Sequence, residues 1–152
     1  MLSPGLLTLW TRQVLEAAHR GDEGLVDEVA VRIAGEADAL DLLAVCRVVA
    51  AEALRALLVL YRPPDPARGE VWVLDQLGDA EGRPGRLFAA RVVTAYANAD
   101  HDHVTALVAA AAGASRDERA ESLRALVTYA AGLRARAARH INSPEGTEHD
   151  EH

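Results

Sequence analysis

The stretch Asp100-His101-Asp102-His103 has the residue types best suited to hold a metal ion. Imidazole nitrogens together with carboxylate oxygens suit zinc and other first-row metals. On a helix, however, residues two apart point to nearly opposite sides, so His101 and His103 can close on one ion only if the chain there forms a loop. We therefore interpret the stretch as a polar helix start. His101 and His103 stay as the candidate metal ligands, and no metal or other cofactor is expected.

Glu52 and Arg55 lie three residues apart in the most apolar stretch of the chain. At that spacing two side chains share one side of a helix. Charges in apolar surroundings form either a structural ion pair or a polar site, and we favour the ion pair. The alternative is a ligand-binding cavity between two halves of the molecule, lined by Glu52, Arg55, Tyr129 and Arg134.

The other polar clusters and the single cysteine have simpler interpretations. An acidic cluster is typical of a solvated helix face when the sequence places no nucleophile or base opposite it. Arginines in the last turns of a helix are expected from the helix dipole. Cys46 lies in an apolar run, which predicts a buried thiol. The sequence contains no glycine-rich phosphate loop, nucleophile elbow or zinc-binding helix motif. The two clusters are Asp22, Glu23, Asp27 and Glu28, and Arg134, Arg136 and Arg139.

Composition favours helices and disfavours two classes of partner. Half of the 152 residues are apolar, but aromatic residues make up only 4%; the rest of the apolar share is mostly Ala, Leu and Val, and Ala and Leu are the strongest apolar helix formers. The net charge of -7 disfavours binding to nucleic acid. The longest apolar run is interrupted by charges, which argues against a membrane-spanning helix. No secretory signal is visible, so we expect a cytoplasmic protein.

Capping residues divide the chain into helices. Ser3 with Pro4, Asp22, Asp38, Asp100 and Ser115 are each typical of a helix start. The helix that follows Asp38 is apolar nearly all round, which is typical of the middle of a bundle. Ser115 and Glu118 predict a capping box. The expected helices cover residues 4–20, 22–35, 38–62, 85–99, 100–112 and 115–141.

The sequence predicts one all-α domain over residues 1–141, a helical bundle of six to seven helices. Its first unit covers residues 3–62 and its second residues 85–141. The connection over 63–84 is rich in Pro, Gly and Asp and contains one short element around 70–77. For this element we prefer a short helix started by Asp65 and Pro66, with Val71, Leu74 and Leu77 facing inward, over a strand from Val71 to Leu74. Residues 142–152 are predicted to be a disordered acidic tail.

The two units align with each other when the sequence is shifted by 79 positions. Between residues 12 and 56, eleven of forty-five pairs are identical, among them Val48 with Val127 and Arg55 with Arg134. An alanine-rich composition gives about four or five matches by chance. The breaks between helices also correspond. We therefore expect two tandem three-helix units related by internal pseudo-symmetry, with their long third helices at the centre.

This architecture leads to two hypotheses about function. The first is a non-enzymatic helical protein that binds other proteins, as an adaptor or regulator, and self-associates. Aromatic side chains concentrate at binding hot spots, so its candidate contact residues are Trp10, Trp72, Phe88 and Tyr96. The second is a small-molecule-binding or enzymatic bundle with a polar cavity between the units.

Overall fold

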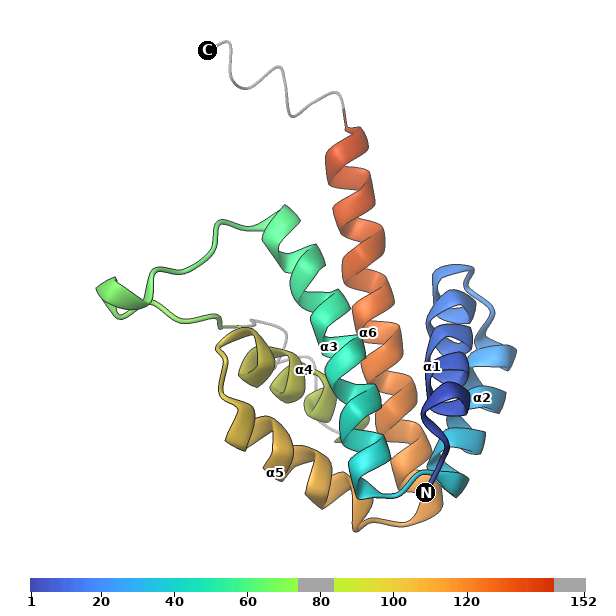
Figure 1. The fold of residues 1–152 in the computed structure, drawn as a ribbon. Coiled ribbons are helices and arrows are strands. Elements are labelled where there is room, and N and C mark those ends of the chain that lie inside the picture. Colours follow the sequence, from blue (N-terminus) through green and yellow to red (C-terminus); the bar gives the residue numbers. More distant parts are fainter. Residues whose placement is uncertain (74–83, 144–152) are drawn as a thin grey trace.

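The computed structural model describes residues 1–73 and 84–143, and every regular element in these ranges is helical (Figure 1). The predicted all-α class is confirmed, with six α-helices in the described ranges. The elements are α1 (Pro4–His19), α2 (Glu23–Glu36), α3 (Ala39–Leu60), the short 3-10 helix η1 (Pro66–Arg68), α4 (Pro84–Ala97), α5 (His101–Ala112) and α6 (Arg116–Asn142).

The helices begin where the capping residues predict. A side-chain oxygen of Ser3, Asp22, Asp38, Asp100 and Ser115 accepts a hydrogen bond from a backbone N–H two or three residues into the helix that follows. The reciprocal capping box is found at α3, where Asp38 and Asp41 cap each other. At α6 the hydroxyl of Ser115 accepts from the backbone N–H of Glu118 at 3.2 Å, which is one half of the predicted box.

The long helices α3 and α6 lie side by side at the centre of the bundle and rise from the same end of the molecule (Figure 1). Hairpins formed by α1 with α2 and by α4 with α5 flank them. The contacts cross between the units: α2 packs on α6, and α5 packs mainly on α3. Each unit therefore covers part of the long helix of the other, while α4 also packs on α6 within its own unit.

Small aliphatic side chains fill the core between the helices. Leu57, Val49, Leu126 and Leu133 are almost completely buried, together with the alanines that let α3 and α6 approach each other. Cys46 is buried as predicted, and burial raises the pKa of its thiol to about 12. The predicted apolar packing of the long helices is thus what the structure contains.

The connection after α3 agrees with the prediction where its short helix begins and differs from it farther along. Its short helix is η1, which begins with Pro66 after the cap Asp65, whereas residues 70–73 form neither helix nor strand. Val71 does not face inward, because 62% of its surface is exposed. The chain lacks an i to i−4 ladder here because Gly69 takes a left-handed conformation with φ 74° and ends η1 after one turn. Leu74 and Leu77 lie outside the described residues, as does the predicted tail beyond residue 143.

Local geometry repeats between the units where their first helices end. The backbone N–H of Asp22 donates to the carbonyl of Ala17 at 2.9 Å, and Asp100 donates to Ala95 at the same distance. In each unit the donating aspartate directly follows a residue in the left-handed conformation, Gly21 in the first unit and Ala99 in the second. These positions differ by 78 residues, one fewer than the 79 of the sequence alignment. Superposition of the complete units remains a prediction.

The register of 79 does not match burial along the third helices. It pairs Val48, which is 50% exposed, with Val127, which is fully buried. A shift of one or two residues turns a helix by 100° or 200°, so an alignment of identical residues can fail to align the buried faces.

None of the described helices is long and apolar enough to cross a membrane.

Candidate functional site

Glu52 connects three helices at the best-defined polar cluster of the structure. Its Oε1 lies 3.2 Å from Nε2 of His19 on α1 and accepts a hydrogen bond from Nη1 of Arg134 on α6 at 3.0 Å. The side chains of Glu52 and His19 are only 14% and 18% exposed, whereas that of Arg134 is 56% exposed. The second oxygen, Oε2, has no hydrogen-bond partner among the described residues. The cluster thus ties the two units together and keeps one carboxylate oxygen unused.

The predicted pair of Glu52 with Arg55 is wrong, because the ion pairs of Glu52 are with His19 and Arg134. Arg55 lies on the exposed side of α3, while Glu52 points inward between α1 and α6. Residues three apart differ by about 60° around a helix axis. That angle is enough to put one side chain in an interface between helices and the other in solvent.

A groove of about 430 Å³ lies between α1 and α3 and reaches this cluster. Its walls are mainly apolar, and Glu52 and Arg134 lie among its lining residues. Thr11, at its base, is buried and uses its hydroxyl to bind the carbonyl of Leu7 on its own helix. The lining comprises Leu7, Thr8, Thr11, Arg12, Leu15, Glu16, His19, Ala44, Val45, Val48, Glu52 and Arg134.

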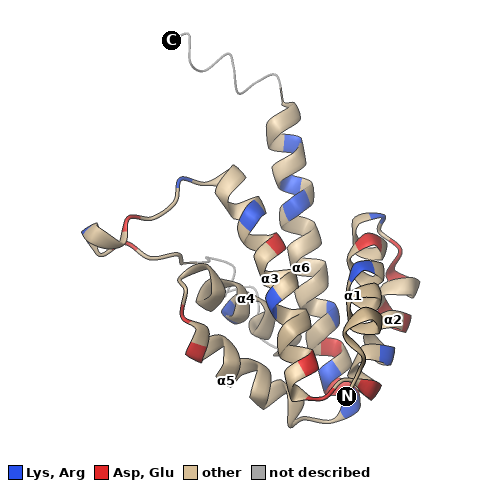
Figure 2. Ribbon diagram, in the orientation of Figure 1, with Lys and Arg blue, Asp and Glu red and all other residues tan. Residues whose placement is uncertain are grey.

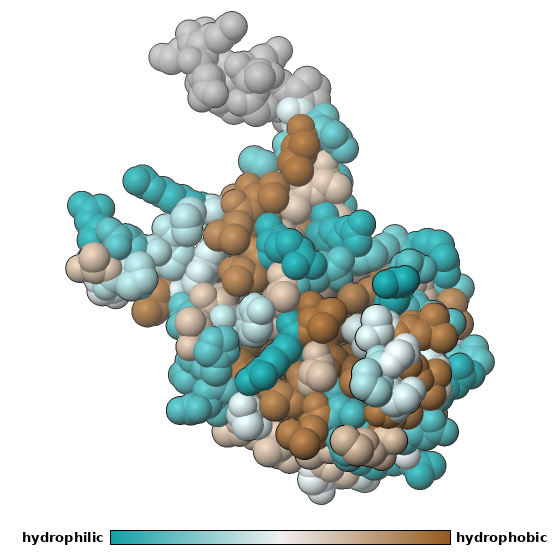
Figure 3. All heavy atoms as spheres, viewed as in Figure 1, coloured by the Kyte–Doolittle hydropathy of each residue, from teal (hydrophilic) through white to brown (hydrophobic). Residues whose placement is uncertain are grey.

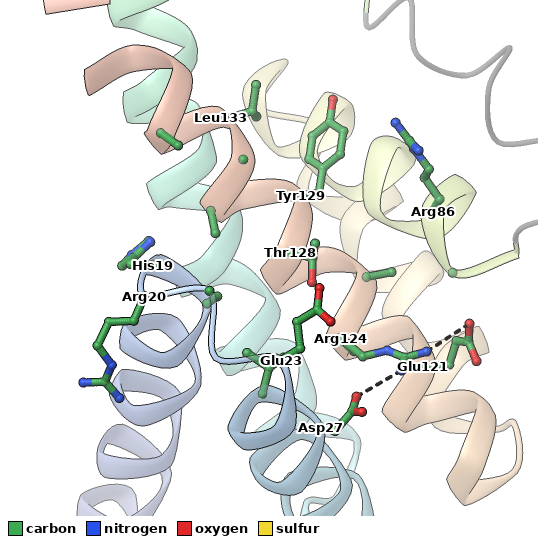
Figure 4. Close-up of a pocket in the computed structure, with 18 of the residues that line it drawn as sticks. His19, Arg20, Glu23, Asp27, Arg86, Glu121, Arg124, Thr128, Tyr129 and Leu133 are labelled. Atoms are coloured by element: carbon green, nitrogen blue, oxygen red, sulfur yellow. Dashed lines mark hydrogen bonds and ion pairs between the residues drawn. The ribbon is translucent and has the colours of Figure 1, made fainter. Parts of the chain in front are cut away.

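Tyr129 lies in a different and larger groove, of about 1120 Å³, which runs along α6 between the α1–α2 joint and the start of α4 (Figure 4). Toward one end, Arg124 is held by Asp27 at 3.0 Å and by Glu121 at 3.4 Å. Toward the other end lie Tyr129 and Arg86, with small residues of α6 forming much of the floor. The structure therefore brings Glu52 and Arg134 together but separates both from Tyr129, and Arg55 lines neither groove.

The phenol of Tyr129 is half-buried, and this burial raises its pKa, although the positive charges of Arg136 and Arg86 oppose the shift. Arg136 donates to the hydroxyl of Tyr61 at 2.8 Å, which ties the end of α3 to α6. Tyr129 therefore stays protonated at neutral pH and offers a hydroxyl for hydrogen bonding.

The candidate metal ligands His101 and His103 are both exposed in the first turn of α5. Asp100 precedes them as the N-cap of α5, and its side chain accepts a hydrogen bond from the backbone N–H of His103. The ring of His101 contacts Tyr96 edge-on, with ring centroids 6.2 Å apart. Within the described part of the chain, no three His, Cys, Asp or Glu side chains are grouped to hold a metal.

The four aromatic residues predicted to contact a partner pack largely against the protein's own core. Trp10 is 8% exposed and packs in the core, with the guanidinium of Arg32 5.6 Å from its ring centre. Trp72, Phe88 and Tyr96 are half-buried against the core. These three keep part of their surface accessible, so their role in partner contact stays a prediction, whereas Trp10 offers little surface to a partner.

Sequence reasoning missed the exposed face of α3. Leu40 is 71% exposed, Val48 50% and Leu58 49%. Ala44 and Ala51 lie between them on the same side, and Arg55 lies between Ala51 and Leu58. We call the five apolar residues the outer stripe of α3. Figure 3 shows apolar side chains over this part of the surface, with polar ones between them. A helix that is apolar all round gives no sequence signal for which side stays uncovered.

Comparison with known proteins adds no assignment. No protein-family model matches the chain, and no curated protein or solved structure is significantly similar to it.

Proposed function

We propose that this chain is a non-enzymatic interaction protein, an adaptor or regulator, that binds a helix of another protein on the outer stripe of α3. The observation that carries the proposal is the exposure of Leu40, Val48 and Leu58 along one side of a 22-residue helix. Single exposed apolar residues are ordinary on protein surfaces, but several of them along one side of a helix favour a contact site.

The surroundings of the stripe support helix binding. The groove between α1 and α3 borders it, and Ala44 and Val48 belong to both. The apolar side chains of an amphipathic helix, spaced three and four residues apart, fit a groove of this kind. The helix α3 is about 33 Å long at 1.5 Å per residue, which is long enough to contact a partner helix of five or six turns along its length.

Site-specific photo-crosslinking tests the proposal. A photoreactive amino acid at Val48 is compared with one at Val31, which is 54% exposed on α2 and lies away from the stripe. In extract of the source cells, position 48 is expected to give a discrete protein adduct that position 31 does not give. The same adduct must disappear when Leu58→Arg is added. Equal labelling at both positions would refute the proposal.

Self-association is the second form of this hypothesis, and the mass in solution decides it. Light scattering on the purified chain, at concentrations up to the micromolar range, gives the mass directly. If the chain is a dimer, Val48→Arg will make it a monomer when the stripe is the interface, and Val31→Arg will not.

A second candidate is binding of a small molecule at the Glu52 cluster, which lies between the units. Two observations favour it: the groove of about 430 Å³, and the Oε2 atom that has no partner among the described residues. A fragment screen by NMR on the native chain and on Glu52→Gln tests it. Hits whose chemical-shift changes centre on residues of this groove, and which are lost in the variant, would favour the second candidate.

A further inference from the structure

The charges of α3 are sorted by sign between its inner and outer sides. Both acidic side chains point inward: Asp41 is 7% exposed and binds the backbone N–H of Leu2, and Glu52 is held by His19 and Arg134. Both basic side chains, Arg47 and Arg55, are exposed. The charge that α3 presents to a partner is therefore positive only.

The positive charge continues beyond α3. The C-terminal part of α6, from Ser122 to Asn142, contains no acidic residue and includes Arg134, whose side chain is 56% exposed beside the groove. Figure 2 shows this segregation, with blue and no red on the upper part of α6. Across the groove α1 contributes one exposed charge of each sign, Arg12 and Glu16. The stripe and the groove beside it thus carry more positive than negative charge, even with Arg134 paired to Glu52, in a chain whose net charge is -7.

We propose that the occupant of the outer stripe is an acidic amphipathic helix of a partner protein, whose apolar residues contact the stripe and whose carboxylates face Arg47, Arg55 and Arg134. This inference rests on the function proposed above and adds the chemistry of the partner. Opposite charges at a rim select the partner and speed its association, while the apolar contact supplies most of the affinity.

Two other occupants fit the charges less well. In a symmetric dimer through this face the same patch meets itself, so Arg47 and Arg55 of one copy would meet the arginines of the other. An anionic membrane would also attract the arginines, but the acidic remainder of the chain opposes its approach. A helix with carboxylates beside its apolar residues meets neither objection.

Three synthetic peptides test the inference on the full chain. They share one set of leucines at helical spacing and carry Glu, Gln or Lys at the flanking positions. Fluorescence anisotropy at low salt is expected to give about tenfold tighter binding for the Glu peptide than for the Gln peptide, from three rim ion pairs, and the weakest binding for the Lys peptide. The differences must shrink as salt rises.

Charge reversal identifies the residues responsible. The variant Arg47→Glu/Arg55→Glu is expected to bind the Lys peptide more tightly than the Glu peptide. The control Arg68→Glu/Arg91→Glu changes the net charge equally at exposed positions outside the stripe and outside α6, and it must keep the native order. If the double variant at α3 does not fold, Arg47→Gln and Arg55→Gln must each narrow the gap between the Glu and Gln peptides.

The outcomes separate this inference from the proposed function. Equal binding of all three peptides, lost in Val48→Arg, would overturn the acidic partner and leave the apolar contact intact. If no peptide binds but position 48 still gives a crosslink in extract, the acidic partner is likewise overturned and the apolar contact remains. Absence of both would end both proposals. The inference also fails if phosphatidylserine vesicles bind the chain through Arg47 and Arg55 without peptide selectivity, or if Val48→Arg dissociates a dimer.

Discussion

Gly21 and Ala99 end the first helix of each unit in the same left-handed conformation, with φ of 72° and 58°. Glycine adopts this conformation freely, but an L-residue with a Cβ atom is strained in it. Ala99 is the only residue other than glycine with positive φ in the described ranges. The second unit therefore carries a backbone strain at Ala99 that the first unit avoids with Gly21. Replacing Gly21 by Ala and Ala99 by Gly should change the free energy of unfolding in opposite directions.

The size of each change in the free energy of unfolding follows from the backbone conformation alone. A Cβ built at Gly21 meets no atom within 4 Å, so Gly21→Ala adds strain and no clash. The left-handed conformation costs an alanine roughly 1–2 kcal/mol, and the greater freedom of glycine in the unfolded chain offsets roughly 0.5–1 kcal/mol of this. We expect Gly21→Ala to lower the free energy of unfolding by about 1 kcal/mol and Ala99→Gly to raise it by about 0.5–1 kcal/mol.

Urea unfolding followed by far-ultraviolet circular dichroism measures both changes. The slope of the free energy against urea should stay constant, because neither variant alters the buried surface. In thermal unfolding, the same changes correspond to shifts of roughly 2–4 °C in opposite directions. The double variant should return to the native value, since the two joints lie in different hairpins and share no partner.

One result would refute this reasoning. If Ala99→Gly leaves stability unchanged or lowers it while Gly21→Ala lowers it as expected, the strain at Ala99 is not present in solution. The two joints then differ in conformation, and their matching hydrogen bonds could not support a common structural origin of the units.

Three further predictions concern single groups. Hydrogen bonding from the backbone N–H of Leu2 lowers the pKa of Asp41 below its ordinary value. The contribution of Asp41 to stability is therefore present above the unfolded pKa and is lost as pH falls through the folded pKa. Asp41→Asn should lower the free energy of unfolding by about 1 kcal/mol at pH 7, and urea unfolding at a series of pH values should find this difference shrinking as the pH falls through the folded pKa. Cys46, with its pKa near 12, should react with an alkylating reagent only after unfolding, which mass spectrometry across a urea series can follow; rapid labelling of the folded chain would contradict its burial. A double-mutant cycle of Glu52→Gln with Arg134→Gln should give a coupling of about 0.5–1 kcal/mol that weakens in salt, because Arg134 is more than half exposed; additive effects would mean that the pair contributes nothing.

The helix boundaries were predictable because their signals are local. A capping side chain such as Ser3, Asp22 or Ser115 acts within three residues of its own position, so the sequence contains the whole interaction. The burial of Cys46 was predictable for a similar reason, since nearly all of its neighbours in the chain, apart from Arg47, are apolar. At residues 70–73 a single turn-forming glycine outweighed the apolar pattern.

The candidate site was less predictable because its contacts join helices far apart in sequence. Glu52 and Arg134 are separated by 82 positions, and nothing near either residue indicates the other. Arg55 was the nearest opposite charge in sequence, but it lies on the exposed side of α3. The uncovered side of α3 depends equally on how α1, α4 and α5 pack around it.

The crossing of the two hairpins gives the connection between the units a particular role. Because α2 packs on α6 and α5 packs on α3, part of each long helix is covered only by the other unit, and separating the halves would expose that part. The connection between α3 and α4 then acts as a tether that sets the effective concentration of one half for the other. Its loss would turn the folding of one chain into the association of two.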